Sequence, residues 1–273
     1  MSQSLKEIGL RSTIRKGLPV TIHGFRLYPI KMSQYEEFEN CKNAIALRVS
    51  SLPVKYISKD YITAVFDFEM DMLIEKKQTA GILARFVHLL LLSLRIENNK
   101  ENQQKLIVVE KSEKGTHLKH FSFIQDGREF TLSPSEISFQ VRPIIAQING
   151  IELPDESDNL DLVIANEQKF ESKAQDAARL KTSVDDLISS VAYLSGCRER
   201  DVDEWTVREF ELRRRAIDRN ANFMLYGQAS LSGFVSFKKG NPYPSWCYDL
   251  LDESLGTQAL SELSFGNVKQ KEN

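Results

Sequence analysis

The sequence predicts an α+β fold, with a small antiparallel sheet and helices in an N-terminal domain and a mainly α-helical C-terminal domain. Two turn signals predict the sheet, because His23-Gly24 and Asp126-Gly127 each stand between runs of alternating or β-branched residues. Apolar residues at helical spacing occupy the stretches between these hairpins. The same spacing dominates from residue 160 onward, which predicts the helical second half.

Composition predicts where the chain divides. We expect an α+β domain over 1–150, an acidic linker over 151–159, a helical domain over 160–245 and a C-terminal tail over 246–273. The linker holds Pro154 among acidic residues, which is typical of a connection between domains. A chain of 273 residues is long enough to bury more than one core.

Strand and helix signals alternate along the N-terminal domain. The expected strands are a hairpin over Val20–Ile30, then Lys105–Lys111, His120–Gln125 and Arg128–Leu132. The expected helices are Gln34–Leu47 after the cap Ser33, Lys59–Lys76 after the cap Ser58, Thr79–Ile96, and a helix after Ser133 that ends at Asn149-Gly150. The polar stretch Asn98–Gln104 predicts a loop, and the strongly apolar Thr79–Ile96 predicts a buried helix.

Proline has two roles in the helix after Ser133. Ser133-Pro134-Ser135-Glu136 places a serine at the N-cap, proline at the first helical position and glutamate at the third, which together predict a well-defined helix start. Pro143 lies inside the same helix, where it lacks an N–H donor and should kink or shorten the helix.

The helical domain should contain three helices. Leu160–Leu180 is helical in pattern but weakly apolar, and Ser183-x-x-Asp186 predicts the start of Val184–Leu194. A charged connector then leads to Thr206–Ser232, which would be roughly 40 Å long at 1.5 Å per residue. Thr206-x-x-Glu209 has the form of a capping box, and Gly233 is the expected C-cap.

The long helix carries a heptad seam, which is the pattern of a helix that packs lengthwise on another helix. The seam consists of Val207, Phe210, Arg214, Ile217, Ala221, Met224, Gln228 and Leu231. Its two polar members, Arg214 and Gln228, distinguish it from a regular coiled coil. The candidate partner-binding residues are Trp205, Val207, Phe210, Arg214, Ile217, Met224, Gln228 and Leu231.

Composition limits the classes of function. The net charge is −2, so the chain as a whole lacks the basic field of a nucleic-acid-binding protein. Three widely spaced cysteines predict no disulfide framework and fit a reducing cytoplasm. The most apolar window, Ile82–Ile96, contains two arginines and a histidine and is too short to cross a bilayer, and the N-terminus lacks the apolar region of a secretory signal.

No residue pattern predicts a catalytic or metal site. His117 and His120 stand three apart on an expected strand and therefore on opposite faces. Asp67-x-Glu69-x-Asp71 lacks the glycine and the distal glutamate of a calcium loop, so we expect a solvated acidic face. The letters of a metal-dependent nuclease pattern, Asp155, Glu167 and Lys169, lie in a linker and a polar helix. We expect no enzyme activity, metal or cofactor.

The arginine run Arg213–Arg215, with Arg208 and Arg219, could contact phosphates. The same window holds the acids Glu204, Glu209, Glu211 and Asp218, so pairing within the helix is the favoured interpretation.

One stretch resembles a known family. The acidic-aromatic entry and helix start Asp203–Glu211, the arginine run and then Phe223–Ala229 resemble the C-terminal motif of tail assembly chaperones of long-tailed bacteriophages. The resemblance covers about Val184–Trp246. It implies a non-enzymatic protein of the host cytoplasm that binds the tape-measure protein, recruits tail-tube subunits and is absent from the finished particle.

Two alternatives stay open. The protein could remain in the virion as a tail or baseplate component, or it could be an unrecognised metal-dependent nuclease that uses Asp155 and Glu167. The sequence leaves a homo-oligomer open and predicts no membrane association.

Overall fold

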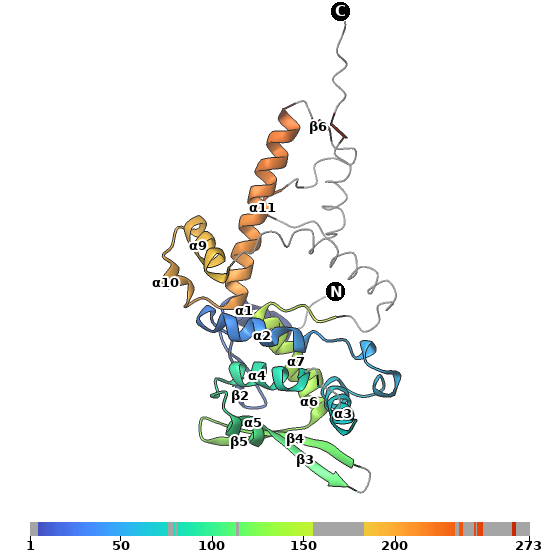
Figure 1. Ribbon diagram of the computed structural model, residues 1–273. Helices are drawn as coiled ribbons and strands as arrows, with labels where there is room; N and C mark the ends of the chain where they lie inside the picture. The colour runs from blue at the N-terminus through green and yellow to red at the C-terminus, as the bar shows by residue number, and fades with distance from the viewer. Residues whose placement is uncertain are drawn as a thin grey trace, which may run out of the picture. The chain divides into compact units, whose positions relative to one another are not determined.

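The computed structural model describes residues 5–75, 79, 81–112, 115–154, 183–232, 235–236, 243, 245–247 and 264–265 (Figure 1). Compactness divides the chain into two units, of which the first comprises Met1–Ser183 with Arg200–Glu209 and the second comprises Val184–Glu199 with Phe210–Asn273. Most of the expected linker, residues 155–159, lies outside the described residues, so the predicted domain division stays a prediction.

The first unit combines helices with two antiparallel sheets. Its helices are α1 (Leu5–Arg15), α2 (Tyr35–Ile45), α3 (Tyr61–Ile74), α4 (Ile82–Leu94), α5 (Lys100–Leu106), α6 (Pro134–Glu136) and α7 (Arg142–Asn149). Its strands are β1 (Val20–Ile22), β2 (Phe25–Leu27), β3 (Ile107–Ser112), β4 (Gly115–Gln125) and β5 (Arg128–Leu132). Short 3-10 turns occur at Met32–Gln34, Val49–Ser51 and Val54–Tyr56. The predicted α+β class is confirmed.

The sheet follows the predicted hairpins. β3, β4 and β5 form an antiparallel sheet in that order, and β1 pairs with β2 around the His23-Gly24 turn. An aromatic cluster joins the β1–β2 hairpin to the three-stranded sheet. The centroid of the Phe25 ring lies 5.1 Å from that of Phe123 and 5.6 Å from that of Phe130. Gln125 of β4 strengthens this junction, since its amide accepts from the Arg26 N–H at 2.7 Å and donates to the Leu94 carbonyl at 3.1 Å.

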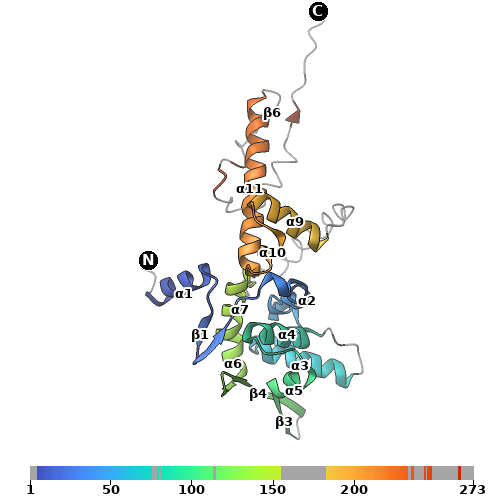
Figure 2. The ribbon, with the colours of Figure 1, turned by 90° about the vertical axis from the view of Figure 1, so that its left-hand side faces the viewer.

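The core of the first unit is centred on α4. This helix packs against α2 and α3 (Figure 2). The side chains of Phe86, Leu89, Leu90, Leu91 and Leu94 are buried, as predicted for the most apolar stretch of the sequence. Full burial of each such side chain contributes about 1.5–3 kcal/mol relative to exposure, so α4 supplies much of the stability of the first unit.

Two predicted helix caps were wrong. α2 begins after Gln34, because Ser33 lies within the 3-10 turn Met32–Gln34. α3 begins after Asp60 rather than Ser58, because the Asp60 carboxylate accepts from the Thr63 N–H at 3.1 Å. In each case a second polar residue stands close to the predicted one, and the geometry of the preceding turn selects between them.

The expected loop Asn98–Gln104 was also wrong, because most of this stretch belongs to α5. Asn99 caps α5 by accepting from the Asn102 N–H at 2.8 Å, and Lys105 pairs with Glu101 one turn earlier at 2.6 Å. These local polar contacts stabilise a helix that has few apolar residues.

The helix after Ser133 is continuous but changes its winding before Pro143. The predicted capping box is present, with Ser133 and Glu136 each accepting from the other's backbone N–H. Residues Ile137–Val141 then form a π-helical turn, and α7 follows with Pro143 near its start. Because proline leaves a carbonyl of the preceding turn without an N–H partner, a wider turn there accommodates it without breaking the helix.

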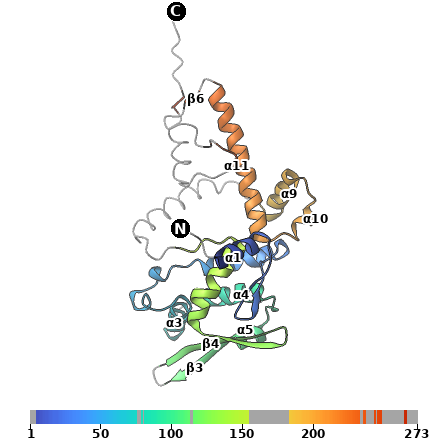
Figure 3. The same ribbon diagram turned by 180° about the vertical axis from the view of Figure 1, so that it is seen from behind.

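The helix α9 (Val184–Ser195) lies in the second unit, α10 (Glu199–Val202) follows it, and α11 (Val207–Leu231) begins in the first unit and continues into the second. α9 lies beside the first half of α11 in all three views (Figure 3). The strands β6 (Val235–Ser236) and β7 (Ser264–Phe265) pair with each other. The expected helix Leu160–Leu180 and the expected C-cap Gly233 lie outside the described residues.

Candidate partner-binding site

The capping box predicted for the long helix is present. The Thr206 hydroxyl accepts from the Glu209 N–H at 3.1 Å, and the Glu209 carboxylate accepts from the Thr206 N–H at 2.8 Å. Two of the backbone donors that a helix leaves without partners at its start are thereby satisfied. The first turn of α11 is consequently well defined by its own residues.

Backbone hydrogen bonds attach this start to the first unit. The Val207 N–H donates to the Ile30 carbonyl at 2.9 Å, and the Met32 N–H donates to the Trp205 carbonyl at 2.9 Å. Asn149 extends the attachment to α7, because its side-chain oxygen accepts from the Ile30 N–H at 2.9 Å. The residues around Thr206 therefore act as an added extended segment beside residues 30–33, a contact that the sequence pattern did not predict.

Two glycines let other helices approach the same turn. Gly17 follows α1 and Gly150 caps α7, and both have positive φ. A Cβ atom would lie 3.3 Å from Thr206 Cγ2 at Gly17 and 3.3 Å from Arg208 Cγ at Gly150. Glycine is favoured at both positions for its conformation and for the close approach that it permits. The Asn149-Gly150 helix end was visible in the sequence, but its contact with Arg208 was not.

The first half of α11 is charged and internally paired. The Arg214 guanidinium contacts the Glu211 carboxylate at 2.8 Å and the Asp218 carboxylate at 3.2 Å. The pairing within the helix that the sequence favoured is therefore observed at Arg214. Such pairs at one-turn spacing stabilise a helix by a few tenths of a kcal/mol each.

The eight candidate partner-binding residues differ widely in exposure. Val207 and Phe210 are 1% and 0% exposed, so they belong to the chain's own core and a partner cannot reach them in this structure. This corrects the expectation that the whole seam contacts a partner. Trp205, Arg214 and Ile217 are half-buried, and Gln228 is exposed. Met224 and Leu231 are 52% and 89% exposed. The accessible part of the seam is therefore its second half.

The opposite side of that second half is covered. Tyr226 is 6% exposed, and its ring centre lies 4.9 Å from that of Tyr243. Burial raises the pKa of Tyr226. About two turns before Tyr226, the Arg219 guanidinium donates to the Trp246 carbonyl at 2.9 Å. Two residues correspond to about 200° of helical rotation, so Tyr226 points roughly away from both Met224 and Gln228.

An exposed stripe therefore runs along the second half of α11. We define the stripe as Ala221, Met224, Leu225, Gln228 and Leu231, all of which are exposed. It lies within residues 220–232, which contain no aspartate, glutamate, lysine, arginine or histidine. A solvent-facing helix surface normally carries charged residues. An exposed, uncharged and largely apolar face of this kind is typical of a surface that another protein covers.

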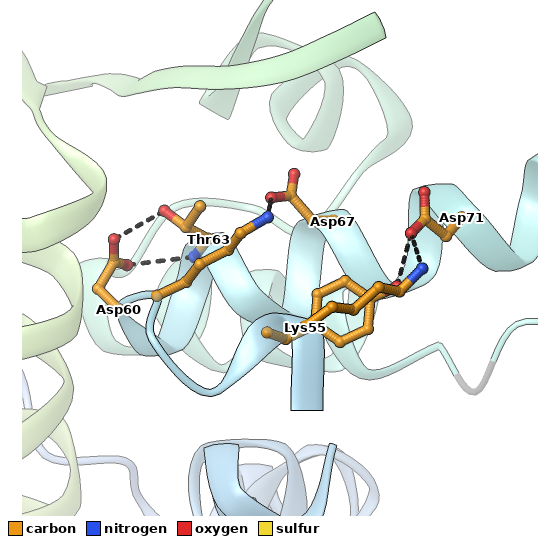
Figure 4. Close-up of polar contacts among 7 residues, drawn as sticks. Lys55, Asp60, Thr63, Asp67 and Asp71 are labelled. Atoms are coloured by element: carbon orange, nitrogen blue, oxygen red, sulfur yellow. Dashed lines mark hydrogen bonds and ion pairs between the residues drawn. The ribbon is translucent and has the colours of Figure 1, made fainter. Parts of the chain in front are cut away.

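A cluster of polar side chains joins α3 to the residues that precede it. Lys55 contacts Asp71 at 2.5 Å, Lys59 contacts Asp67 at 2.5 Å, and the Tyr56 hydroxyl donates to Asp71 at 2.6 Å (Figure 4). The hydrogen bonds from Lys55 and Tyr56 lower the pKa of Asp71. These contacts hold residues 55–59, which precede α3, against the side of the helix.

The two aspartates of α3 are paired with lysines and Glu69 is buried, which corrects the expectation that all three acids form a free solvated face. Glu69, between the two paired aspartates, is buried and accepts from the Ile82 N–H at the start of α4. Because each of the three acids has a protein partner, their arrangement serves packing.

Within the described part of the chain, no group of three or more histidine, cysteine or acidic residues could hold a metal ion. The nuclease-like residues Asp155, Glu167 and Lys169 lie outside the described residues. Among the described helices, none combines the length and the apolar character needed to cross a membrane.

The chain was compared with protein families, with curated proteins and with solved structures. No family model, no curated protein and no solved structure matches the chain. The function proposed below is therefore argued from the exposed stripe and from the sequence motif that overlaps it.

Proposed function

We propose that the protein is a non-enzymatic assembly factor that binds a helical partner through the stripe on α11. The observation that carries the proposal is the exposed, uncharged and apolar face at residues 220–232. An amphipathic helix can cover such a face with its own apolar side, by anchors spaced three and four residues apart. The stripe has this spacing, because Ala221, Met224, Gln228 and Leu231 follow one another at steps of three, four and three.

The resemblance to tail assembly chaperones identifies the partner that we propose. The first part of the resembling motif, Asp203–Glu209, supplies the hydrogen bonds that attach the start of α11 to the first unit. Its last part, Phe223–Ala229, contains Met224, Leu225 and Gln228 of the stripe. Asp203–Glu209 would therefore position the start of α11, and Phe223–Ala229 would expose the stripe to the partner. The partner is then the long helical tape-measure protein, bound in the host cytoplasm before tail-tube subunits are recruited.

Co-expression with a tape-measure protein tests the proposal. We expect a soluble complex that copurifies, and we expect Met224→Asp or Leu231→Asp to abolish it, because each places a charge in the apolar contact. Ser230→Asp is the matched control, since Ser230 is exposed on the same turn but lies on the other side of the helix. Phe210→Asp is unsuitable, because Phe210 is fully buried and its substitution would unfold the protein.

Two results would contradict the proposal. One is capture of the partner that Leu231→Asp and Ser230→Asp leave equally intact while both variants keep the wild-type circular dichroism. The other is the presence of the chain in purified virions at the level of a tail protein, measured by mass spectrometry, which would favour the alternative of a structural tail or baseplate component.

A further inference from the structure

The stripe has a second property, which is complementarity to itself. When two copies of α11 run antiparallel with their centre near residue 226, Ala221 of one copy meets Leu231 of the other, and Met224 meets Gln228. The first pair combines a small with a large side chain, which is how facing layers of a helix pair fill space. The second pair places a flexible thioether against the aliphatic stem of a glutamine.

Charge does not oppose this pairing. Two identical helices usually bring like charges together somewhere along their contact, and such contacts are destabilising. Residues 220–232 contain no aspartate, glutamate, lysine, arginine or histidine, so neither copy presents a charge to the other over this stretch near neutral pH.

We propose that the occupant of the stripe in the free protein is a second copy of this chain, paired antiparallel through residues 220–232. This inference rests on the proposed function, because the second copy occupies the face that the partner helix needs. The helical part of this stretch, residues 220–231, extends only about 18 Å. A single helix pair of that length buries far less than the about 800 Å² per partner of a standard stable complex. The dimer is therefore weak, and a long partner helix displaces it.

Cysteine cross-linking tests the register. In a background of Cys197→Ser and Cys247→Ser, only Cys41 remains, and it is buried, with burial raising the pKa of its thiol to about 12. Ala221→Cys and Leu231→Cys are prepared as separate proteins. Mixed and mildly oxidised, they should form a disulfide-linked dimer, because each thiol meets the other across the two-fold axis. Each protein alone should not, because its two thiols lie at opposite ends of the contact.

Ser230→Cys is the control for random collision, since it is exposed but lies off the stripe. The mixture should cross-link severalfold above this control, and the tape-measure partner should suppress the cross-link. Cross-linking of either single variant alone above the control, or a mixture that stays at the control level, overturns the antiparallel dimer. A mixture at the control level together with intact partner capture would leave the proposed function standing, whereas a cross-link that the partner does not suppress would count against the proposed function alone.

Discussion

Two buried serines of the first unit differ in their hydrogen bonds, and this difference fixes their contribution to stability. Ser138 Oγ donates to Asp60 at 2.7 Å and accepts from the Ile62 N–H at 3.0 Å. Ser93 Oγ on α4 is buried and has no hydrogen-bond partner in the described structure. A buried polar atom without a partner costs about 1–3 kcal/mol, whereas a satisfied one contributes about 1 kcal/mol.

We therefore expect the two alanine substitutions to differ in sign. Ser93→Ala should leave the free energy of unfolding unchanged or raise it by up to about 1 kcal/mol, and Ser138→Ala should lower it by about 1–2 kcal/mol. Urea denaturation of the two variants measures both values. A loss at Ser93 as large as that at Ser138 would show that the Ser93 hydroxyl has a partner in solution.

The carboxyl group of Asp71 gives stability a pH dependence. Hydrogen bonds from Lys55, and then from Tyr56, hold the pKa of Asp71 below its ordinary value of 3.8. A lowered folded-state pKa stabilises the fold above the unfolded-state pKa, and the contribution is lost as the pH falls through the folded-state value. The contribution is small, because the Lys55–Asp71 pair is partly exposed.

Asp71→Asn removes this contribution, so we expect the variant to be less stable than the wild type near neutral pH. The difference between the two should shrink as the pH falls below about 4, because the wild-type carboxyl then becomes neutral as well. Urea denaturation of both proteins across this range measures it. A difference that is independent of pH would contradict the assigned role of the Asp71 charge.

At the scale of elements, the start of α11 depends on backbone approach at Gly150. Gly150 and Gly196 have nearly the same conformation, with φ of 72° and 69°. Only at Gly150 would a Cβ atom meet a neighbour, Arg208 Cγ at 3.3 Å, and at Gly196 it would meet nothing within 4 Å. An L-residue in the left-handed conformation costs about 1–2 kcal/mol at either position.

Gly150→Ala should therefore destabilise the protein more than Gly196→Ala, which serves as the control for the conformational cost alone. The measurement is the free energy of unfolding of both variants from urea denaturation. Equal losses at the two glycines would mean that Arg208 moves aside at no cost, and that the contact between α7 and α11 is unimportant for stability.

Local sequence patterns predicted those elements whose signals are short-range. The His23-Gly24 and Asp126-Gly127 hairpins and the capping boxes at Ser133 and Thr206 depend on residues within a few positions of one another, and the structure has all four. The cap at Asp60 and the helix α5 were missed, although Asn99 is a residue type that commonly caps a helix. Competing polar residues made these starts ambiguous.

The candidate site was predicted in part, because exposure is a property of the folded chain. Heptad spacing placed Val207 and Leu231 on one seam, but it could not show that the first is buried and the second exposed. The attachment of Val207 to Ile30 joins residues far apart in the sequence, which no local pattern reports. The absence of charge from residues 220–232 was visible in the sequence, and it became informative only once Tyr226 was found covered on the opposite side.

At the scale of the whole molecule, the first turn of α11 and its later turns differ in their surroundings. The first turn belongs to the α+β unit, to which it is attached by hydrogen bonds with residues 30–33 and by the close approach of Gly17 and Gly150. The later turns carry the stripe, which no described residue covers. An exposed, uncharged and largely apolar helix face of this kind is typical of a surface that another protein covers.

Amide hydrogen exchange on α11, in the free chain diluted until it is monomeric and in the complex with a tape-measure protein, tests this account most directly. Exposed helix ends open readily and exchange fast, whereas helix that is packed in an interface is protected. We predict strong new protection at residues 220–232 on binding, and little change at Thr206 and Val207, whose amides are already hydrogen-bonded. A complex that forms with no added protection at residues 220–232 would contradict the account.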